Sequence, residues 1–187
     1  MNSKIFVMAA PAIFIGVIST PAFSQAEKVM RGGEITESAL IDALTPAPST
    51  SGTRSIRPMR ENGPRTTPIS PVKTARTSLL ITFETNSADL TSQAKQSLDV
   101  LGEALNSSKL AEFNFAVEGH ADPRGTSGAN LELSRQRAEA VRRYLVQHKG
   151  IEDRRLEAIG KGDRELINAA NPYAPENRRV TIVNRSQ

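Results

Sequence analysis

An aspartate and an arginine carry the clearest chemical signal in this 187-residue chain. Arg137 lies four residues after Leu133 and four before Val141, in a run whose apolar residues recur at helical spacing. The pattern therefore places the guanidinium on the inward face of a helix that starts at about Asn130. Asp122 precedes a proline and belongs to the turn before that helix. A buried guanidinium needs an anion, because removing the partner of a buried charge costs about 3–5 kcal/mol.

Two interpretations of this pair are open from spacing alone. In the first, Asp122 and Arg137 form an internal ion pair that fixes the turn to the helix. In the second, they form a receptor for a zwitterionic ligand. The carboxylate would then accept an ammonium group, and the guanidinium would bind a carboxylate through two parallel hydrogen bonds.

The stretch from Gly119 to Val141 resembles the signature of the OmpA-like family of peptidoglycan-binding domains, G-H-T-D-x-x-G-x-x-x-Y-N-x-x-L-S-x-x-R-A-x-x-V. The residues that match it in register and without a gap are Gly119, His120, Asp122, Gly125, Asn130, Leu133, Ser134, Arg137, Ala138 and Val141. Two positions depart from the pattern, with Ala121 in place of the usual Thr and Ala129 in place of the usual Tyr. The resemblance extends more loosely from about Leu79 to Asn184.

The resemblance implies a ligand and a set of site residues. In that family the Asp and Arg hold the amine and the carboxylate of a diaminopimelate side chain in the peptidoglycan stem peptide, which implies these roles for Asp122 and Arg137. Asn86 matches an asparagine that lines the pocket in similar proteins; the alternative is a simple turn residue. Ala121 lacks the hydroxyl of Thr but still offers main-chain atoms. Asn130 either donates to the ligand or caps the helix.

Arg178 and Arg179 stand in an N-R-R-V run that also matches the family. Side chains alternate along a strand, so these two are expected on opposite faces. We expect at most one of them to reach the pocket, and a structural salt bridge is the favoured role.

The surrounding elements predict an α+β domain over residues 79–187. Strand-like runs at 78–83, 113–117, 156–159 and 180–183 alternate with a helix capped by Thr91 and with the helix from about Asn130. The run at 113–117 alternates apolar and polar residues, which indicates one buried face. This order, β-α-β-α-β-β, favours a two-layer sandwich with the helices on one face of a mixed four-stranded sheet. The resemblance implies the same OmpA-like fold.

Residues 1–24 have the features of a secretory signal peptide. Lys4 precedes an apolar run over 5–18, and small residues stand at Ala22 and Ser24, where a signal peptidase would cleave. The run is shorter than the roughly 20 residues that span a bilayer, which favours cleavage over an uncleaved anchor. The chain contains no cysteine, which excludes disulfides and a lipid attached through an N-terminal cysteine.

Residues 25–78 are predicted to form a disordered, basic linker. Between Thr45 and Ser78, 18 of 34 residues are Pro, Ser or Thr. The segment therefore has too few apolar residues to offset the conformational entropy that it would lose on ordering. A short helix is expected at about 36–44, capped by Thr36. Isolated helices of this length are marginal. The helix is therefore either a transient turn or a docking peptide that folds on a partner or against the domain.

The excess of basic residues lies in this linker. Residues 25–78 carry eight basic and five acidic residues, whereas 79–187 carry fifteen of each. The linker is either a solvated spacer or a segment drawn weakly to polyanions such as lipopolysaccharide, anionic lipid or wall polymer. Nucleic acid is not an expected partner, because the basic part of the linker has no aromatic residue for base stacking.

No pattern in the sequence indicates catalysis. The two histidines are too few for a histidine metal cluster, and neither a nucleophile-elbow motif nor a phosphate-binding glycine loop is present. We therefore expect no metal and no cofactor. The sequence predicts a non-catalytic, periplasmic, peptidoglycan-binding protein, associated with the cell wall or outer membrane of a Gram-negative bacterium. The alternative is an envelope scaffold that recruits a partner through its N-terminal tail, with Asp122 and Arg137 as a structural ion pair.

Overall fold

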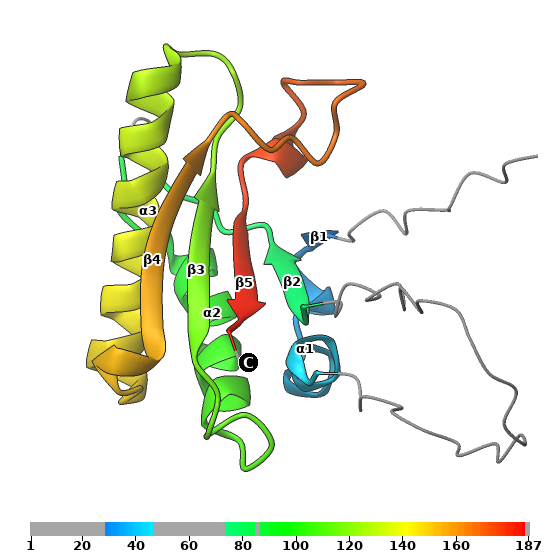
Figure 1. Cartoon of the computed structure of the whole chain (residues 1–187), viewed down its shortest axis with the longest axis vertical. Helices are drawn as coiled ribbons and strands as arrows, with labels where there is room; N and C mark the ends of the chain where they lie inside the picture. Colours follow the sequence, from blue (N-terminus) through cyan, green and yellow to red (C-terminus); the bar gives the residue numbers. More distant parts are fainter. Residues whose placement is uncertain (1–28, 47–73, 85–86, 186–187) are drawn as a thin grey trace, which may run out of the picture.

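The computed structural model describes residues 29–46, 74–84 and 87–185, and Figure 1 shows the arrangement of their elements. The strands are β1 (Val29–Met30), β2 (Arg76–Leu79), β3 (Phe115–His120), β4 (Leu156–Gly162) and β5 (Val180–Asn184). The helices are α1 (Glu37–Leu44), α2 (Ser92–Asn106) and α3 (Ser127–Lys149). Three short 3-10 turns are η1 (Gly32–Glu34), η2 (Asp153–Arg155) and η3 (Pro175–Asn177). No helix in this part of the chain is both long and apolar enough to cross a membrane.

The five strands form one mixed sheet in the order β1-β2-β5-β3-β4. β3 pairs in parallel with β4, and β5 lies antiparallel between β3 and β2. The three helices cover one face of the sheet, with α2 and α3 behind β3, β4 and β5 in the view of Figure 1. The predicted α+β class with helices on one side of a mixed sheet is therefore confirmed, whereas the predicted count of four strands is one too few.

Local sequence signals account for the helix ends. The side chains of Thr36, Thr91 and Thr126 each accept a hydrogen bond from a backbone N–H in the first turn of α1, α2 and α3, as good N-caps do. The caps at Thr36 and Thr91 match the prediction. α3 ends at Gly150, whose φ of 67° lies in the left-handed region that glycine adopts without steric cost.

The core lies between the helices and the sheet. Its fully buried apolar side chains come from every layer: Leu40, Leu44, Leu79, Leu98, Leu101, Leu105, Val117, Leu145 and Ile182. α3 packs mainly on β3 and β4. The approach is close because Gly160 has no side chain: a Cβ there would lie 2.7 Å from the Leu131 carbonyl oxygen. Ser134 reinforces this contact, since its Oγ accepts a hydrogen bond from the Gly162 N–H at 2.9 Å.

The N-terminal segment 29–46 belongs to the folded unit, which differs from the predicted domain start at residue 79. β1 extends the sheet beside β2, and α1 packs against α2 and β2. Leu40 and Leu44 are fully buried, and the Asn184 side chain donates to the Leu44 carbonyl oxygen at 2.9 Å. A helix predicted at about 36–44 is present and folds against its own domain, one of the alternatives left open by the sequence. Its burial on the sheet supplies the stability that an isolated helix lacks.

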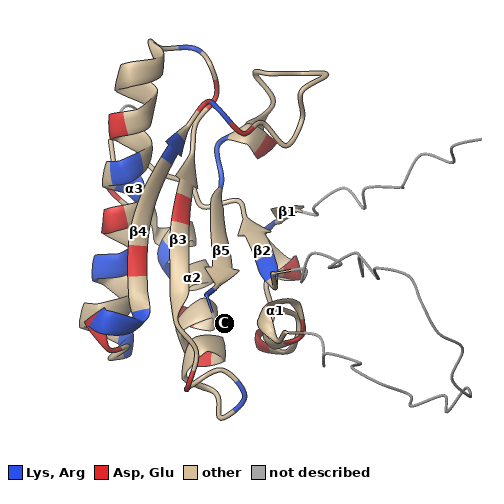
Figure 2. Cartoon of the chain, viewed as in Figure 1, with Lys and Arg blue, Asp and Glu red and all other residues tan. Residues whose placement is uncertain are grey.

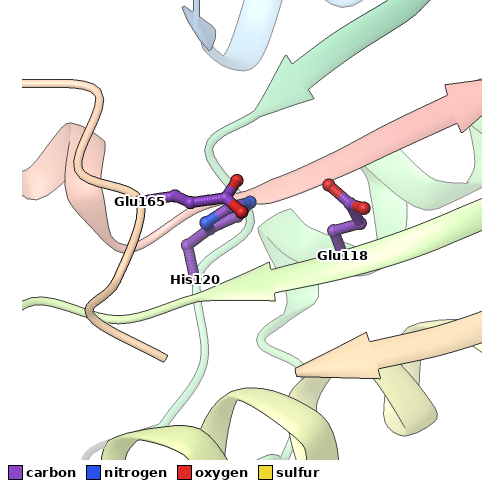
Figure 3. Close-up of side chains that lie close together, drawn as sticks. All are labelled: Glu118, His120 and Glu165. Carbon is purple, nitrogen blue, oxygen red and sulfur yellow. The ribbon is translucent and has the colours of Figure 1, made fainter. Parts of the chain in front are cut away.

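Strand β3 is more buried than its alternating sequence predicts. All six of its residues are buried, including Glu118 and His120 on the face that the helices do not cover. The prediction of a single buried face is therefore wrong. Side chains from two other segments cover this second face: Lys161 of β4 pairs with Glu118, and Glu165, which follows β4, lies beside His120 (Figure 3).

The start and the inward face of α3 also differ from the prediction. The helix begins at Ser127 rather than at about Asn130, and its buried residues are Asn130, Ser134, Ala138, Val141 and Leu145. Arg137 is only partly buried and lies at the border of this face.

Several predictions concern residues outside the described ranges. The signal peptide at 1–24, Asn86 and most of the basic linker belong to this group. Cleavage of the signal peptide and the recruitment of a partner by the tail stay predictions.

Candidate functional site

A cavity of about 540 Å³ opens where the C-terminal end of β3 meets the first turns of α3. Its lining comes from four segments that the sheet brings together: Phe83, Glu84, Ala121, Asp122, Arg124, Gly125, Ala129, Asn130, Leu133, Arg137 and Arg178. Four of the predicted site residues, Ala121, Asp122, Asn130 and Arg137, are among them. A cavity of similar size, about 580 Å³, lies at the opposite end of β3 and contains none of these residues.

Asp122 is held in this cavity by two arginines. Its side chain is 8% exposed, and its Oδ2 accepts a hydrogen bond from Arg178 Nη1 at 2.7 Å. Arg124 Nε lies 3.6 Å from the same oxygen, and the Arg124 backbone N–H donates to Oδ1 at 3.4 Å. The negative charge of the buried carboxylate is therefore compensated mainly by Arg178. Arg178 lies just before β5, next to the C-terminal end of β3.

The predicted alternative of an Asp122–Arg137 ion pair is wrong in this structure. Within residues 29–46, 74–84 and 87–185, no acidic oxygen lies within 4 Å of the Arg137 guanidinium. Arg137 instead donates from Nε to the Ser87 carbonyl oxygen at 3.1 Å and stacks on Phe83, with its guanidinium carbon 4.9 Å from the ring centre. Arg178 takes the position on Asp122 that the sequence pattern suggested for Arg137.

The environment of Arg137 favours a bound anion. Burial lowers the pKa of Arg137, and the nearby positive charge of Arg178 acts in the same direction, while Asp122 opposes both. A guanidinium remains charged even so. The Nε contact and the ring stacking fix the plane of the group, and its two terminal nitrogens make no hydrogen bond to a described residue. Two parallel N–H donors in this arrangement match the two oxygens of a carboxylate.

Asn130 is engaged with its own chain. Its amide nitrogen donates to Asp163 Oδ2 at 3.0 Å and to the Gly125 carbonyl oxygen at 3.4 Å. The N-cap of α3 is Thr126, so the alternative of Asn130 as the cap is wrong. The hydrogen bonds from Ser127 and Asn130 hold the pKa of Asp163 below its ordinary value. A ligand contact from Asn130 is therefore left to its amide oxygen.

The two positions that depart from the family signature both lie in the cavity wall. Ala121 is buried, and its backbone N–H donates to the Gly162 carbonyl oxygen at 2.8 Å. A main-chain contact from Ala121 to a ligand must therefore use its carbonyl oxygen. Ala129 lies in the first turn of α3 and leaves open the volume that a larger side chain would fill.

Arg178 and Arg179 point to opposite sides, as strand alternation predicts. Arg178 lines the cavity, whereas Arg179 is buried and donates to Ser78 Oγ at 3.3 Å and to the Glu165 carbonyl oxygen at 3.2 Å. Sequence reasoning assigned neither Arg124 nor Phe83 to the site. Arg124 lies in the loop after β3 and Phe83 in the segment after β2. Their direction toward the cavity depends on the tertiary path of these two loops, which local spacing does not predict.

The charges on the outer side of α3 are arranged differently. Figure 2 shows acidic and basic residues interleaved along this helix. Glu132 pairs with Arg135 at 2.8 Å, and Glu139 pairs with Arg142 at 3.3 Å. The charges within each of these pairs neutralise one another, in contrast to the two arginines that lie around the single buried acid of the cavity.

Comparison with known proteins agrees with the fold. The model of the OmpA family matches residues 82–179, more than half of the chain, and the chain belongs to this family. The matched range contains both Asp122 and Arg137.

Curated relatives include several peptidoglycan-associated lipoproteins. The one from Rhizobium meliloti (strain 1021) is 33% identical over 105 residues, which cover 55% of this chain and 58% of that protein. The one from Mesorhizobium japonicum is 36% identical over 102 residues, covering 54% and 59%. The match thus spans less than two thirds of these relatives.

Two solved structures have a similar fold. The peptidoglycan-associated lipoprotein from Burkholderia pseudomallei matches with a TM-score of 0.50 and 30% identity, over 58% of this chain and 89% of that one. The cell wall anchor of the T6SS from Pseudomonas aeruginosa matches with a TM-score of 0.51 and 26% identity, over 62% and 84%.

Proposed function

We propose that this protein binds peptidoglycan without catalysis, through the diaminopimelate of the stem peptide, and so links itself to the cell wall in the periplasm. Membership of the OmpA family supports the proposal, as do relatives whose names describe peptidoglycan-associated lipoproteins and a cell wall anchor. The diaminopimelate end carries an ammonium and a carboxylate, the two charges that the cavity is equipped to meet.

The observation that best supports the proposal is the orientation of the Arg137 guanidinium and its lack of an acidic partner among the described residues. A guanidinium that is partly buried, fixed in its plane and without an acidic partner in the described chain is a preorganised anion receptor. A carboxylate of the ligand would receive two parallel hydrogen bonds from its terminal nitrogens. Because the guanidinium is already oriented, little conformational entropy is lost on binding.

Asp122 supplies the negative side of the receptor. Among the described residues, one of its oxygens accepts a hydrogen bond from Arg178 at 2.7 Å, and the other accepts only the long 3.4 Å contact from the Arg124 backbone N–H. The second oxygen therefore has capacity for the ligand ammonium. Asp122 and Arg178 remain paired during binding, which spares the complex a buried unpaired charge.

Titration of a diaminopimelate-containing muropeptide against the purified protein tests this function. We expect Asp122→Ala and Arg137→Ala each to lose about 2–5 kcal/mol of binding, because the opposite charge of the ligand is left without its partner. Arg143→Ala, an exposed change on the same helix, is the matched control and should bind as wild type. Thermal unfolding of each variant separates loss of binding from loss of fold. Wild-type affinity in both site variants would refute the assignment.

A related measurement addresses the cell wall itself. Purified sacculi should sediment the wild-type protein and leave Arg137→Ala in the supernatant. Sacculi rich in diaminopimelate and sacculi in which lysine replaces it provide the comparison, since lysine lacks the second carboxylate. Equal sedimentation with both would show wall binding by another route.

A further inference from the structure

A second cluster of chemically active side chains lies on the sheet face away from the helices (Figure 3). Glu118 and His120 are two residues apart on β3 and therefore project to the same side. Glu165 approaches them from the segment that follows β4, and its carboxylate lies beside the imidazole. One ligand atom from each of the three residues lies within 4.8 Å of the other two.

His120 is the unexplained member of this cluster. It is 2% exposed, and among the described residues neither ring nitrogen has a partner with good hydrogen-bond geometry, although the Glu165 backbone interacts with the ring. Buried polar groups in proteins are nearly always partnered, so an exception calls for an explanation. Burial, aided by the positive charges of Arg179, Lys161 and Arg76, lowers the pKa of His120 to about 3, although the Glu165 backbone acts in the opposite direction. The ring is therefore neutral at physiological pH, the form in which a nitrogen lone pair can bind a metal ion.

The two carboxylates of the cluster already share a cation. Lys161 Nζ lies 3.4 Å from a Glu118 oxygen and 2.9 Å from a Glu165 oxygen. The ammonium group shows that this position attracts positive charge. Lys161 is itself 28% exposed, and an open hollow of about 400 Å³ is lined by Lys161, Glu118 and Glu165, which gives access from solvent.

We propose that Glu118, His120 and Glu165 form a binding site for a divalent transition-metal ion of the zinc class, which takes the place of the Lys161 ammonium between the two carboxylates. One imidazole nitrogen and two carboxylates form a ligand set that suits zinc, whereas magnesium and calcium prefer oxygen ligands alone. Zinc binds such atoms at roughly 2.0–2.2 Å, so the three side chains need to close by about 1 Å. A fourth coordination position is left for water.

Two further arginines limit the affinity of this site. Arg76 and Arg179 act on His120 through their charge, and Arg179 also donates to the Glu165 carbonyl oxygen. Both arginines disfavour a dication, while Lys161 competes with it directly. Binding should therefore be reversible, and it should strengthen when Lys161 is neutralised. None of the three metal ligands lines the Asp122 cavity, so this site goes beyond the proposed wall-binding function.

Calorimetric titration with zinc chloride tests the proposal on the full chain, freed of metal by chelation and without a histidine tag. We expect one zinc ion per chain. Glu165→Gln, at an exposed carboxylate, should weaken binding at least tenfold, and Lys161→Gln should strengthen it several-fold. Glu157→Gln, at another exposed carboxylate on the neighbouring strand β4, is the matched control and should leave zinc affinity unchanged. Unchanged affinity in Glu165→Gln, or weaker binding in Lys161→Gln, would overturn the proposal.

NMR of the two histidine rings gives a second test, which needs no variant. The chain has only two histidines, His120 and His148, and His148 lies on α3 stacked on Tyr144. Zinc should shift the imidazole NMR signals of His120 and leave those of His148 in place. A response confined to His148, or none at either ring, would refute the site.

Discussion

Arg137 Nε donates to the Ser87 carbonyl oxygen at 3.1 Å, which fixes the guanidinium in the wall of the cavity. This contact joins α3 to the loop before α2, two segments that are 50 residues apart in the chain. The arginine thus uses one nitrogen for the fold and has two terminal nitrogens that make no hydrogen bond to a described residue. The binding and folding roles of the same side chain can be separated by experiment.

Arg137→Lys tests the need for a planar, two-pronged donor. Lysine keeps the positive charge but cannot form two parallel hydrogen bonds or stack as a plane on Phe83. We expect at least a tenfold loss of muropeptide affinity, about 1.4 kcal/mol or more, in calorimetric titration. Arg135→Lys, an exposed position on the same helix, is the control and should bind normally. Full affinity in Arg137→Lys would mean that charge alone is recognised.

Arg178→Ala removes the principal partner of Asp122. The carboxylate is 8% exposed and loses its 2.7 Å hydrogen bond, so the free energy of unfolding should fall by about 1–2 kcal/mol in urea. Arg124→Ala should cost less, because Arg124 is 64% exposed and lies 3.6 Å away. An equal loss of stability in both variants would contradict the assignment of Arg178 as the main partner.

The sequence predicted those parts of the site that follow from local spacing. The N-caps Thr36 and Thr91, the helix that contains Arg137 and the turn that holds Asp122 are all set within a few residues, whereas Arg137 lies at the border of the buried face and not in its middle. The partner of Asp122 was missed, because Arg178 is 56 residues away and meets it only through the pairing of β3 with β5. Hydrophobic periodicity contains no information about which strands become neighbours.

The helix at 36–44 was predicted, but its inclusion in the domain was only one of the alternatives left open, for a related reason. A short helix that precedes a Pro/Ser/Thr-rich stretch has no local evidence of a partner. Its partner surface is formed by β2 and α2, which are distant in the sequence. The cluster of Glu118, His120 and Glu165 was likewise not predicted, because Glu165 is distant from the other two in the sequence and meets them only in the folded chain.

Leu40→Ala measures how much α1 contributes to the domain. Leu40 is fully buried in the shared core, so its truncation should lower the free energy of unfolding by about 2–5 kcal/mol. Asp42→Ala, on the exposed side of the same helix, should stay within about 0.5 kcal/mol of wild type. Urea unfolding checks both. A small effect of Leu40→Ala would mean that residues 29–46 are dispensable for stability.

The buried imidazole of His120 should make stability depend on pH. Its pKa is lowered from 6.5 to about 3 in the folded protein, mainly by burial, with Arg179, Lys161 and Arg76 adding to the shift; Glu118 and Glu165 are the acidic groups that face it. Between these two values the unfolded chain binds a proton that the folded chain does not. Stability from this group is thus complete above pH 6.5 and declines as the pH falls toward 3.

Within that window the decline in the free energy of unfolding should approach about 1.4 kcal/mol per pH unit, before carboxylates add their own effect. Urea unfolding at pH 7.5, 6 and 5 in the presence of a chelator measures it. NMR then assigns it, because the His120 imidazole signals should stay constant from pH 8 to 5 in the folded protein. Titration of His120 near pH 6.5 would show that the ring reaches solvent, and it would remove both the predicted pH dependence and the unpartnered buried nitrogen on which the metal site rests.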